Sequence, residues 1–358
     1  MAVTIYDVAA HAGVSPRTVS NVVNDYPFVA AATRARVRKS IDALGYRPNV
    51  MARNLRQGRS GMIALAVPEL SVPYFSELCG AIIDEVVGRS YAVVIEQTDG
   101  DPARERQLMD QSGRGQMFDG FIFSPLGLSE SELASISRTI PVVLLGEKVK
   151  GGTFDHVSVD NVAAARAAVE HLVELGHRRI AAIGDQPYET GETAQLRTQG
   201  YRLALENAGI PHNSRLVVRT SRFHRHDGAE SMKRLLSLAR PPDGVFCYND
   251  LLAAGAIREV LRRGLRVPED IAVVGFDDIE EGRYSTPTLT TISPAKGDIA
   301  ALAVDQLFRR LGGDTGKPVD LQASFHLEAR ESTLGLFKTE AQDVLPPRPA
   351  RPLKTAAR

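Results

Sequence analysis

The sequence predicts an α/β protein with a small all-α head and a core of two lobes, each built on a doubly wound parallel sheet. Three observations predict this fold. Two short helical patterns meet at a glycine near the N-terminus, an alternation of apolar runs and amphipathic helices begins at Gly61, and that alternation starts again near Asn161. Short apolar runs separated by helices are typical of parallel sheets covered on both faces. Two successive sets therefore indicate two lobes.

The head begins with Thr4–Asn24, where the residue pattern predicts two helices and a tight turn. The first helix carries an apolar stripe at helical spacing, formed by Ile5, Val8, Ala9 and Ala12. Gly13 follows directly and suits a left-handed residue that ends this helix. Ser15 can cap the second helix, and Pro16 stands at its first position, where a missing N–H costs nothing.

The second helix presents a polar face. Its buried edge is formed by Val19, Val22 and Val23, whereas Arg17, Asn21 and Asn24 share the opposite face. In a major groove, Arg suits guanine and Asn suits adenine. Taken alone, the pattern also fits an ordinary helical hairpin with a solvated face.

Charge supports the first interpretation. A third helix over 33–44 can close a small core with Val37, Ile41 and Leu44. Residues 1–60 carry nine Lys or Arg and three Asp or Glu, a net charge of about +6, whereas the whole chain balances 43 against 43. Basic charge concentrated on one small module is typical of phosphate binding. Residues 1–47 are therefore predicted to form a helix-turn-helix DNA-binding domain.

Four motifs carry a family resemblance. The segments IYDVAAHAGVSPRTVSNVVN, TRARV, LGYRPN and MARNL resemble, in this order, the motifs of the lactose/galactose repressor family. The resemblance places Pro16, Arg17 and Asn21 at the positions that specify the operator. It implies contacts with phosphates or flanking bases by Thr4, Tyr6, Ser15, Thr18, Ser20, Asn24 and Tyr46. Ala30 departs from the family, which usually has Ser ahead of the third helix, and such a lost cap typically costs about 1 kcal/mol.

Residues 48–60 are predicted to form a hinge helix and linker. Asn49 can cap a helix over 50–56, which is too short to be stable alone, since helices under ~12 residues are marginal in water. A solvated linker is the alternative. Leu55 is a large apolar side chain in a basic segment, and such side chains wedge between base steps in the minor groove. The resemblance implies paired Leu55 insertion by two subunits, with Arg53 and Arg56 on phosphates, and adds Asn49 and Ala52 to the DNA-binding residues.

The core is predicted over 61–337. Strands are expected at 62–68, 91–97, 118–123 and 141–146, then at 179–184, 216–219, 244–249 and 271–278. Helices are expected at 75–88, 102–116, 130–137, 161–175, 195–208, 227–238 and 253–263. A late helix over 298–311 and a strand over 321–327 return to the lobes. This is a periplasmic-binding-protein-like architecture, with one lobe about 61–160 and 292–320 and the other about 161–291 and 321–337.

Composition bounds the environment of the protein. The two cysteines, Cys79 and Cys247, lie far apart and flank no metal-ligand spacing, which fits a reducing compartment. The sequence has no N-terminal apolar run of signal length and nothing near the ~20 apolar residues of a membrane span. We expect a soluble cytoplasmic protein associated with the nucleoid.

Enzyme motifs are missing from the sequence. No G-x-G-x-x-G, G-x-x-x-x-G-K-[ST] or G-x-S-x-G occurs after a predicted strand. His224 and His226 flank Arg225, but such a pair alone is more often a solvated loop than a metal site. Asp277 and Asp278 are adjacent and should point apart, whereas glycosidase carboxyls face each other at ~5–9 Å. We predict no catalytic residue, no metal and no cofactor.

Polar and aromatic side chains at strand ends predict a ligand site, because open α/β sheets bind ligands there. The candidates are Tyr74, Phe75, Ser124, Arg197, Phe223, Asn249 and Asp277. Guanidinium, amide and carboxylate groups can bind vicinal hydroxyls. Singly, each aromatic also fits a core position, and each Asp a helix cap. The family resemblance places Arg197, Asn249 and Asp277 at effector contacts, and we assign Asp160 a structural or inter-lobe role.

Together these features predict a homodimeric transcriptional repressor that binds a palindromic operator and responds to a small-molecule effector, a sugar or sugar derivative. Residues 338–358 are rich in Pro and basic residues and are predicted to be a disordered tail. The tail lacks a leucine heptad, so a dimer is expected. The sequence leaves open whether the effector induces or corepresses. The alternative is a solute-binding or sugar-processing protein with the same lobes.

Overall fold

A computed structural model describes residues 3–47, 59–109, 117–135, 140–147, 154–187 and 192–336. Contacts divide the chain into two compact units, one formed by residues 1–61 with 117–119 and the other by the remaining residues. The predicted hinge helix, with Asn49, Ala52, Arg53, Leu55 and Arg56, and the predicted tail lie outside the described residues. Both stay predictions.

The head consists of three helices, α1 (Ile5–Ala12), α2 (Pro16–Val23) and α3 (Ala31–Leu44). A capping box begins α1, in which Thr4 N–H donates to the Asp7 carboxylate at 2.8 Å and Thr4 Oγ1 accepts from Asp7 N–H. Gly13 ends α1 with φ 64°, as predicted. Ser15 caps α2, because its Oγ accepts from Thr18 N–H at 3.1 Å.

The head has its own hydrophobic core. Its buried members come from all three helices and are Val8, Ala9, Ala12, Val19, Val22 and Val37. Ile41 and Leu44 pack against them, as predicted. The helix α3 begins two residues before the predicted Thr33, and Ala30 ahead of it gives no side-chain cap. The first turn of α3 therefore has no side-chain acceptor at its N-cap.

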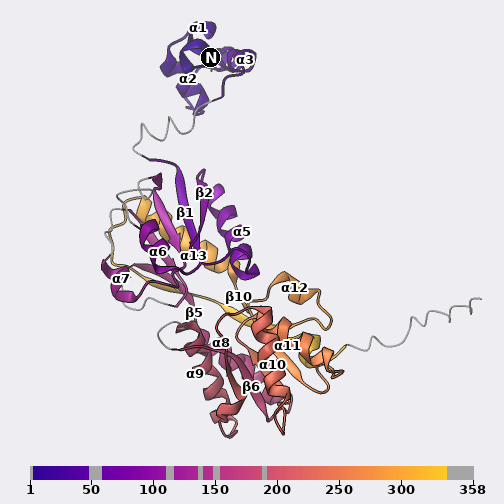
Figure 1. Cartoon of the computed structure of the whole chain (residues 1–358). Helices are drawn as coiled ribbons and strands as arrows, with labels where there is room; N and C mark the ends of the chain where they lie inside the picture. The colour runs from indigo at the N-terminus through magenta and orange to yellow at the C-terminus, as the bar shows by residue number, and fades with distance from the viewer. Residues whose placement is uncertain are drawn as a thin grey trace, which may run out of the picture. The chain divides into compact units, whose positions relative to one another are not determined.

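The first lobe holds a six-stranded sheet in the order β11-β5-β4-β3-β1-β2, with every pair parallel (Figure 1). Its strands are β1 (Met62–Val67), β2 (Ala92–Gln97), β3 (Gly120–Phe123), β4 (Val142–Leu145), β5 (Asp155–Val159) and β11 (Asp320–Ala323). Its helices are α5 (Pro73–Val87), α6 (Pro102–Met109), α7 (Glu130–Ser135) and α13 (Lys296–Leu311). Every residue of β3 and β4 is buried, as expected for strands covered on both faces.

The second lobe holds another six-stranded sheet, in the order β12-β10-β9-β8-β6-β7, and only β10 and β12 run antiparallel to each other. Its strands are β6 (Ile180–Asp185), β7 (Val217–Arg219), β8 (Gly244–Cys247), β9 (Ala272–Phe276), β10 (Thr290–Pro294) and β12 (Phe325–Glu328). Its helices are α8 (Asn161–Glu174), α9 (Glu192–Asn207), η2 (Ser214–Leu216), α10 (Arg225–Leu236), α11 (Asp250–Arg262), α12 (Glu280–Arg283) and α14 (Glu331–Leu334). The closest helix pairs are α8 with α9 and α10 with α11.

Three segments connect the lobes within the described residues. They join β5 to α8, β10 to α13, and β11 to β12. At the first, Asp160 caps α8 by accepting from Ala163 N–H at 2.9 Å, which is the structural role that we assigned to it. At the third, Ser324 alone separates the two strands.

The prediction of a single strand over 321–327 was wrong, because β11 and β12 belong to different sheets. The chain accordingly changes lobe at 295 and at 324, a few residues after the expected positions. The sequence analysis also missed β5 and β10. The latter is buried although it contains Thr290 and Thr291, because hydrogen bonds satisfy its polar groups. For example, Thr290 N–H donates to Ser332 Oγ at 2.8 Å.

The longest helices of the described segments, α9 and α13, have 16 residues each. A bilayer span needs about 20 predominantly apolar residues. No helix in the described ranges combines the length and the apolarity that crossing a membrane requires.

Candidate functional site

The outward face of α2 is the first candidate site. Pro16 occupies its first turn, Arg17 and Asn24 are exposed, and Asn21 is partly buried. Asn24 Nδ2 donates to the Ser20 carbonyl at 2.9 Å, so its amide is turned onto its own helix. In the described part of the chain, neither Arg17 nor Asn21 has a side-chain hydrogen-bond partner. Both remain available to acceptors and donors outside the head.

Other predicted DNA-binding residues also stabilise the head. Thr4 and Ser15 are the N-caps of α1 and α2, and the hydroxyls of Ser15 and Thr18 lie 2.9 Å apart. Tyr6 is 71% exposed. Tyr46 is partly buried and packs against the head core. These positions combine exposure with a fixed backbone, which a phosphate contact requires.

The turn between α2 and α3 contains Asp25, which pairs with two basic residues of α3. Asp25 accepts from Arg34 Nη1 at 3.1 Å and from Arg38 Nη2 at 2.9 Å. Arg34 Nη2 also donates to the Tyr26 carbonyl at 2.7 Å. The same turn presents the edge-to-face pair of Tyr26 and Phe28, and Phe28 is 85% exposed. The sequence analysis missed this exposed aromatic pair.

A cavity of about 940 Å³ lies in the two-lobed unit, and residues of both lobes line it. All seven residues predicted from strand ends are among its lining, namely Tyr74, Phe75, Ser124, Arg197, Phe223, Asn249 and Asp277. Ser124, Asn249 and Asp277 follow β3, β8 and β9 at the carboxyl ends of the two sheets, where ligands bind in such folds. Tyr74 and Phe75 reach the cavity from α5, and Arg197 reaches it from α9. The volume is in the range of small-molecule sites.

Arg197, on α9, is the buried cation of this cavity, with 7% exposure. Its Nε donates to Asn161 Oδ1 at 2.7 Å, and its Nη1 donates to the Tyr248 carbonyl. The guanidinium lies over the Phe276 ring, 3.5 Å from the ring centre. Burial lowers the pKa of Arg197, and the nearby Asp277 opposes that shift. The side chain is therefore held in place by protein contacts before any ligand arrives.

Asp277 follows β9 and is also 7% exposed. Its φ is 119° and that of Asp278 is 48°, two successive non-glycine residues in a sparsely populated region. Such strain tends to occur at functional sites. No side chain or amide of the described residues donates to the Asp277 carboxylate, and burial raises its pKa to about 7 against the opposing charges of Arg197 and Lys296. This carboxylate is thus an unpaired acceptor in the cavity wall.

Asn249 and Phe223 are linked to each other. Asn249 caps α11 by accepting from Leu252 N–H at 2.9 Å, and its Nδ2 donates to the Phe223 carbonyl at 3.1 Å. The Asn249 amide already hydrogen-bonds to the protein through both its oxygen and its nitrogen. It therefore has less capacity to bind an effector than the sequence suggested. The Phe223 ring lies edge to face with Tyr248, at 6.4 Å between ring centres.

The remaining predicted residues belong to the first lobe. Tyr74 and Phe75 lie in the first turn of α5 with their rings 5.3 Å apart, edge to face. Ser124 follows β3 and is buried. Together they give the cavity an aromatic wall and a hydroxyl opposite the charged residues of the second lobe.

Comparison with known proteins assigns the chain to a family. Residues 4–49 match the model described as bacterial regulatory proteins, lacI family, and residues 169–333 match the periplasmic binding protein-like domain. The ribose operon repressor of Escherichia coli (strain K12) is 33% identical over 331 residues, which cover 92% of this chain and 99% of that protein. The chain belongs to the LacI family. As a LacI-family protein, it is a DNA-binding transcriptional regulator with an effector-binding type of core.

Two solved structures of transcriptional regulators resemble this chain along most of its length. The Lac repressor dimer bound to operator and the anti-inducer ONPF is 29% identical, covers 93% of this chain and 100% of its own, and has a TM-score of 0.80. The complex of the transcriptional regulator CelR with cellobiose is 31% identical, covers 92% and 99%, and has a TM-score of 0.69. The predicted fold, a helical head followed by two parallel-sheet lobes, is confirmed.

The cavity of this LacI-family protein also contains residues that the sequence analysis missed. They are polar side chains at or near strand ends, including Glu69, Gln97, Asp99, Glu147, Gln186, Glu192 and Thr220. Glu147 lies two residues after β4, so the strand-end rule that selected Ser124 could have selected it too. Its carboxylate accepts from Asn161 Nδ2 at 2.6 Å.

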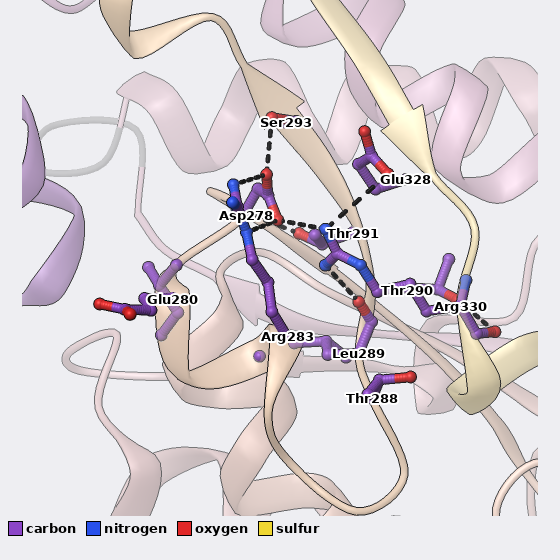
Figure 2. A network of polar contacts seen from close by, with 12 residues as sticks. Asp278, Glu280, Arg283, Thr288, Leu289, Thr290, Thr291, Ser293, Glu328 and Arg330 are labelled. Carbon is purple, nitrogen blue, oxygen red and sulfur yellow. Dashed lines mark hydrogen bonds and ion pairs between the residues drawn. The ribbon is translucent and has the colours of Figure 1, made fainter.

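Asp278 is not among the residues that line the cavity and belongs to a separate polar network (Figure 2). Its carboxylate accepts from Arg283 Nη2 at 2.6 Å, from Arg330 Nη2 at 2.6 Å and from Ser293 Oγ at 3.0 Å. Burial alone would raise the pKa of Asp278, but the hydrogen bonds from Arg283 and Arg330 hold it below its usual range. The expectation that the adjacent carboxyls point apart is confirmed.

Three contacts of this LacI-family core bridge the lobes beside the cavity. Lys296 Nζ donates to the carbonyl of Asp277 at 2.5 Å and pairs with Glu77 of α5 at 2.9 Å. Glu77 also accepts from Glu280 N–H of α12 at 2.9 Å. His224 Nε2 lies 3.4 Å from Glu69 Oε2, so this histidine takes part in an inter-lobe contact.

Proposed function

We propose that this LacI-family protein represses transcription by binding a palindromic operator as a homodimer, under the control of a sugar or sugar derivative. The observation that supports this most is the cavity, where seven residues chosen from strand ends line one space between two lobes. A ligand that binds one lobe arrangement preferentially shifts the population toward it. The lobe arrangement would then control how the two heads engage two half-sites.

On the DNA side, we propose that Pro16, Arg17 and Asn21 specify the operator. Flanking base or phosphate contacts would come from Thr4, Tyr6, Ser15, Thr18, Ser20, Asn24 and Tyr46, and from the hinge residues Asn49, Ala52, Arg53, Leu55 and Arg56. The exposed, unpaired Arg17 supports this assignment, as does the operator complex of the related Lac repressor. Such binding requires the compartment that holds the DNA, so we place the protein in the cytoplasm.

On the effector side, we propose that Tyr74, Phe75, Ser124, Arg197, Phe223, Asn249 and Asp277 contact the ligand. The CelR complex contains cellobiose, which favours a sugar here as well. We propose no enzymatic activity. A solute-binding protein with the same lobes is the competing function, and the lacI-type head over residues 4–49 favours the regulator.

Selection of bound duplexes from a random DNA pool tests the proposal. We expect the full chain to enrich a two-fold symmetric sequence and to run as a dimer in sedimentation, also after deletion of residues 340–358. A sugar that binds the cavity should change operator affinity in wild type but not in Asp277→Ala. Enrichment of no symmetric sequence would contradict the repressor assignment and favour the solute-binding alternative.

A further inference from the structure

The cavity contains more acidic than basic groups. Its described lining includes five carboxylates, Glu69, Asp99, Glu147, Glu192 and Asp277, and two guanidinium groups, Arg197 and Arg222. Two of the acids already have side-chain partners. Glu69 lies against His224 at 3.4 Å, and Asp99 pairs with Arg104. The excess of negative charge is therefore carried by the other acids.

Asp277 and Glu147 are two acids of the cavity lining that both lie near Arg197. Asp277 is 7% exposed and receives no hydrogen bond at its carboxylate from the described residues. The Glu147 carboxylate accepts from Asn161 Nδ2 at 2.6 Å, a neutral donor. Among the described residues, no lysine or arginine forms an ion pair with either carboxylate. Both thus keep acceptor capacity directed toward the cavity.

Arg197 acts on both acids through its charge but forms no ion pair with either of them. Its Nε is bound to Asn161 Oδ1 and its Nη1 to the Tyr248 carbonyl, so neutral acceptors hold the guanidinium. Asn161 stands between the charges, because it donates to Glu147 and accepts from Arg197. With both acids ionised, two carboxylates face the one guanidinium of Arg197, and the nearby Lys296 is already paired with Glu77.

Burial makes this excess charge costly. It raises the pKa of Asp277 to about 7, while Arg197 and Lys296 lower it and Glu77 adds to the rise. Burial likewise raises the pKa of Glu147 to about 7, with Arg197 opposing and Glu192 adding. A neutral ligand would displace water and increase this cost, whereas a ligand cation would offset it.

We propose that the effector carries a protonated amino group, as an amino sugar does, and that Glu147 binds this group together with Asp277. The proposal rests on the proposed function, since it takes the cavity to be the effector site. Hydroxyl oxygens of such a ligand can accept from the remaining N–H groups of Arg197, and its ring can pack against Tyr74 and Phe75. Acidic ligands such as sugar phosphates or uronates would add negative charge beside two carboxylates, which disfavours them.

Matched sugar triples test this charge preference on the full-length protein. Each triple has an amino, a neutral and an acidic member of one hexose configuration, for example glucosamine, glucose and glucuronate, with galactose and mannose triples beside it. Thermal shift selects the configuration, and titration calorimetry then measures the affinity. Because charged hydrogen bonds are roughly twice as strong as neutral ones, we expect the amino member to bind about tenfold more tightly than the neutral one.

Proton linkage gives a second, independent readout. At a pH below the pKa of the ligand amine, the free ligand is already protonated. There a ligand cation lowers the pKa of both acids, so an amino sugar should release protons on binding, whereas a neutral sugar should take them up. Calorimetry in buffers of different ionisation enthalpy measures the sign. Glu147→Gln should remove most of the preference for the amino member, whereas Glu206→Gln, an exposed acid on α9 outside the cavity lining, should retain it.

Each outcome decides the proposal. Tighter binding of a neutral or acidic member, or an unchanged amino preference in Glu147→Gln, would overturn the amino-effector inference. If a neutral sugar bound more tightly and changed operator affinity in wild type but not in Asp277→Ala, the proposed function would stand. If no member of any triple shifted the melting temperature, both the amino-effector inference and the sugar assignment would fail.

Discussion

Arg17 in α2 and Arg197 in α9 are the same residue type in opposite settings. Arg17 is exposed and has no side-chain partner in the described chain, whereas Arg197 is 7% exposed and bonded to Asn161 and Tyr248. The position of Arg17 is set by the eight residues of α2 and their caps. The position of Arg197 depends on segments of the second lobe that lie far apart in the sequence.

The difference separates two ways of building a binding site. A face that reads DNA must leave its side chains free of the protein and only needs a rigid backbone beneath them. A desolvated cavity must hold its charges before the ligand arrives, because mobile side chains would cost ordering entropy on binding. Substitutions of exposed, unpaired side chains in the head should therefore change binding without changing folding, and substitutions in the cavity should change both.

Arg197→Ala should have the largest effect on stability. Removing the guanidinium leaves Asn161 Oδ1 and the Tyr248 carbonyl without their donor and leaves Asp277 without its nearby cation. We expect the free energy of unfolding of the core to fall by about 3–5 kcal/mol, the range for breaking a buried charged network. Urea denaturation measures it. A loss below about 1 kcal/mol would show that Arg197 is held for the ligand alone.

Asp277→Asn should change the pH dependence of stability. The pKa of Asp277 is raised to about 7 in the folded protein from an ordinary value of 3.8, so its ionisation opposes folding. Wild-type stability should fall as pH rises from about 4 to about 7, and the variant should lack this loss. At pH 8 the variant should be more stable by about 2–4 kcal/mol, since one pKa unit corresponds to 1.36 kcal/mol.

The neighbouring Asp278→Asn is the matched control, since two arginines hold that carboxylate and lower its pKa. It should destabilise the protein at pH 8, so the two adjacent substitutions should have opposite signs. Equal signs would show that the burial of Asp277 is offset by a partner.

Arg17→Ala should leave folding unchanged and weaken operator binding by about 1–3 kcal/mol, with relaxed preference at one base position of each half-site. Fluorescence anisotropy on operator and random duplexes measures both affinities. Arg17→Lys is the control, because it keeps the charge but loses the two-pronged geometry that selects guanine. Equal losses on both duplexes in Arg17→Ala would indicate that Arg17 contacts only phosphate.

The contrast between the head and the cavity also explains which features could be predicted from the sequence. The head followed from local signals, since Gly13 and Ser15 occupy their predicted roles and the apolar stripe forms the core. Strand ends and the family resemblance together also predicted seven cavity residues. The features that could not be predicted depend on tertiary contacts. The change of sheet at Ser324 has no apolar signal, and buried Thr290 relies on partners about 40 residues away.

The hydrogen-bond partners of the predicted residues could not be predicted from the sequence either. Nothing local indicates that Asn249 commits its amide to α11 and Phe223, or that Asn161 separates Arg197 from Glu147. Strand-end position identifies which residues reach the cavity, but the charge balance there depends on contacts between distant segments.

The smallest effect that we predict lies in the head, at the first turn of α3. Ala30 has φ −54° and ψ 140°, an extended conformation compatible with an N-cap, but its side chain accepts no hydrogen bond. Ala30→Ser supplies the missing acceptor, as Ser15 does for α2 at 3.1 Å. A side-chain cap contributes about 1 kcal/mol. Where the opening equilibrium of the helix sets the exchange rate, this corresponds to roughly fivefold slower amide exchange. Exchange at Thr33 N–H should slow accordingly, while the cavity and its ligand affinity should stay unchanged. Unchanged exchange at Thr33 would show that water already satisfies this turn as well as a serine hydroxyl can.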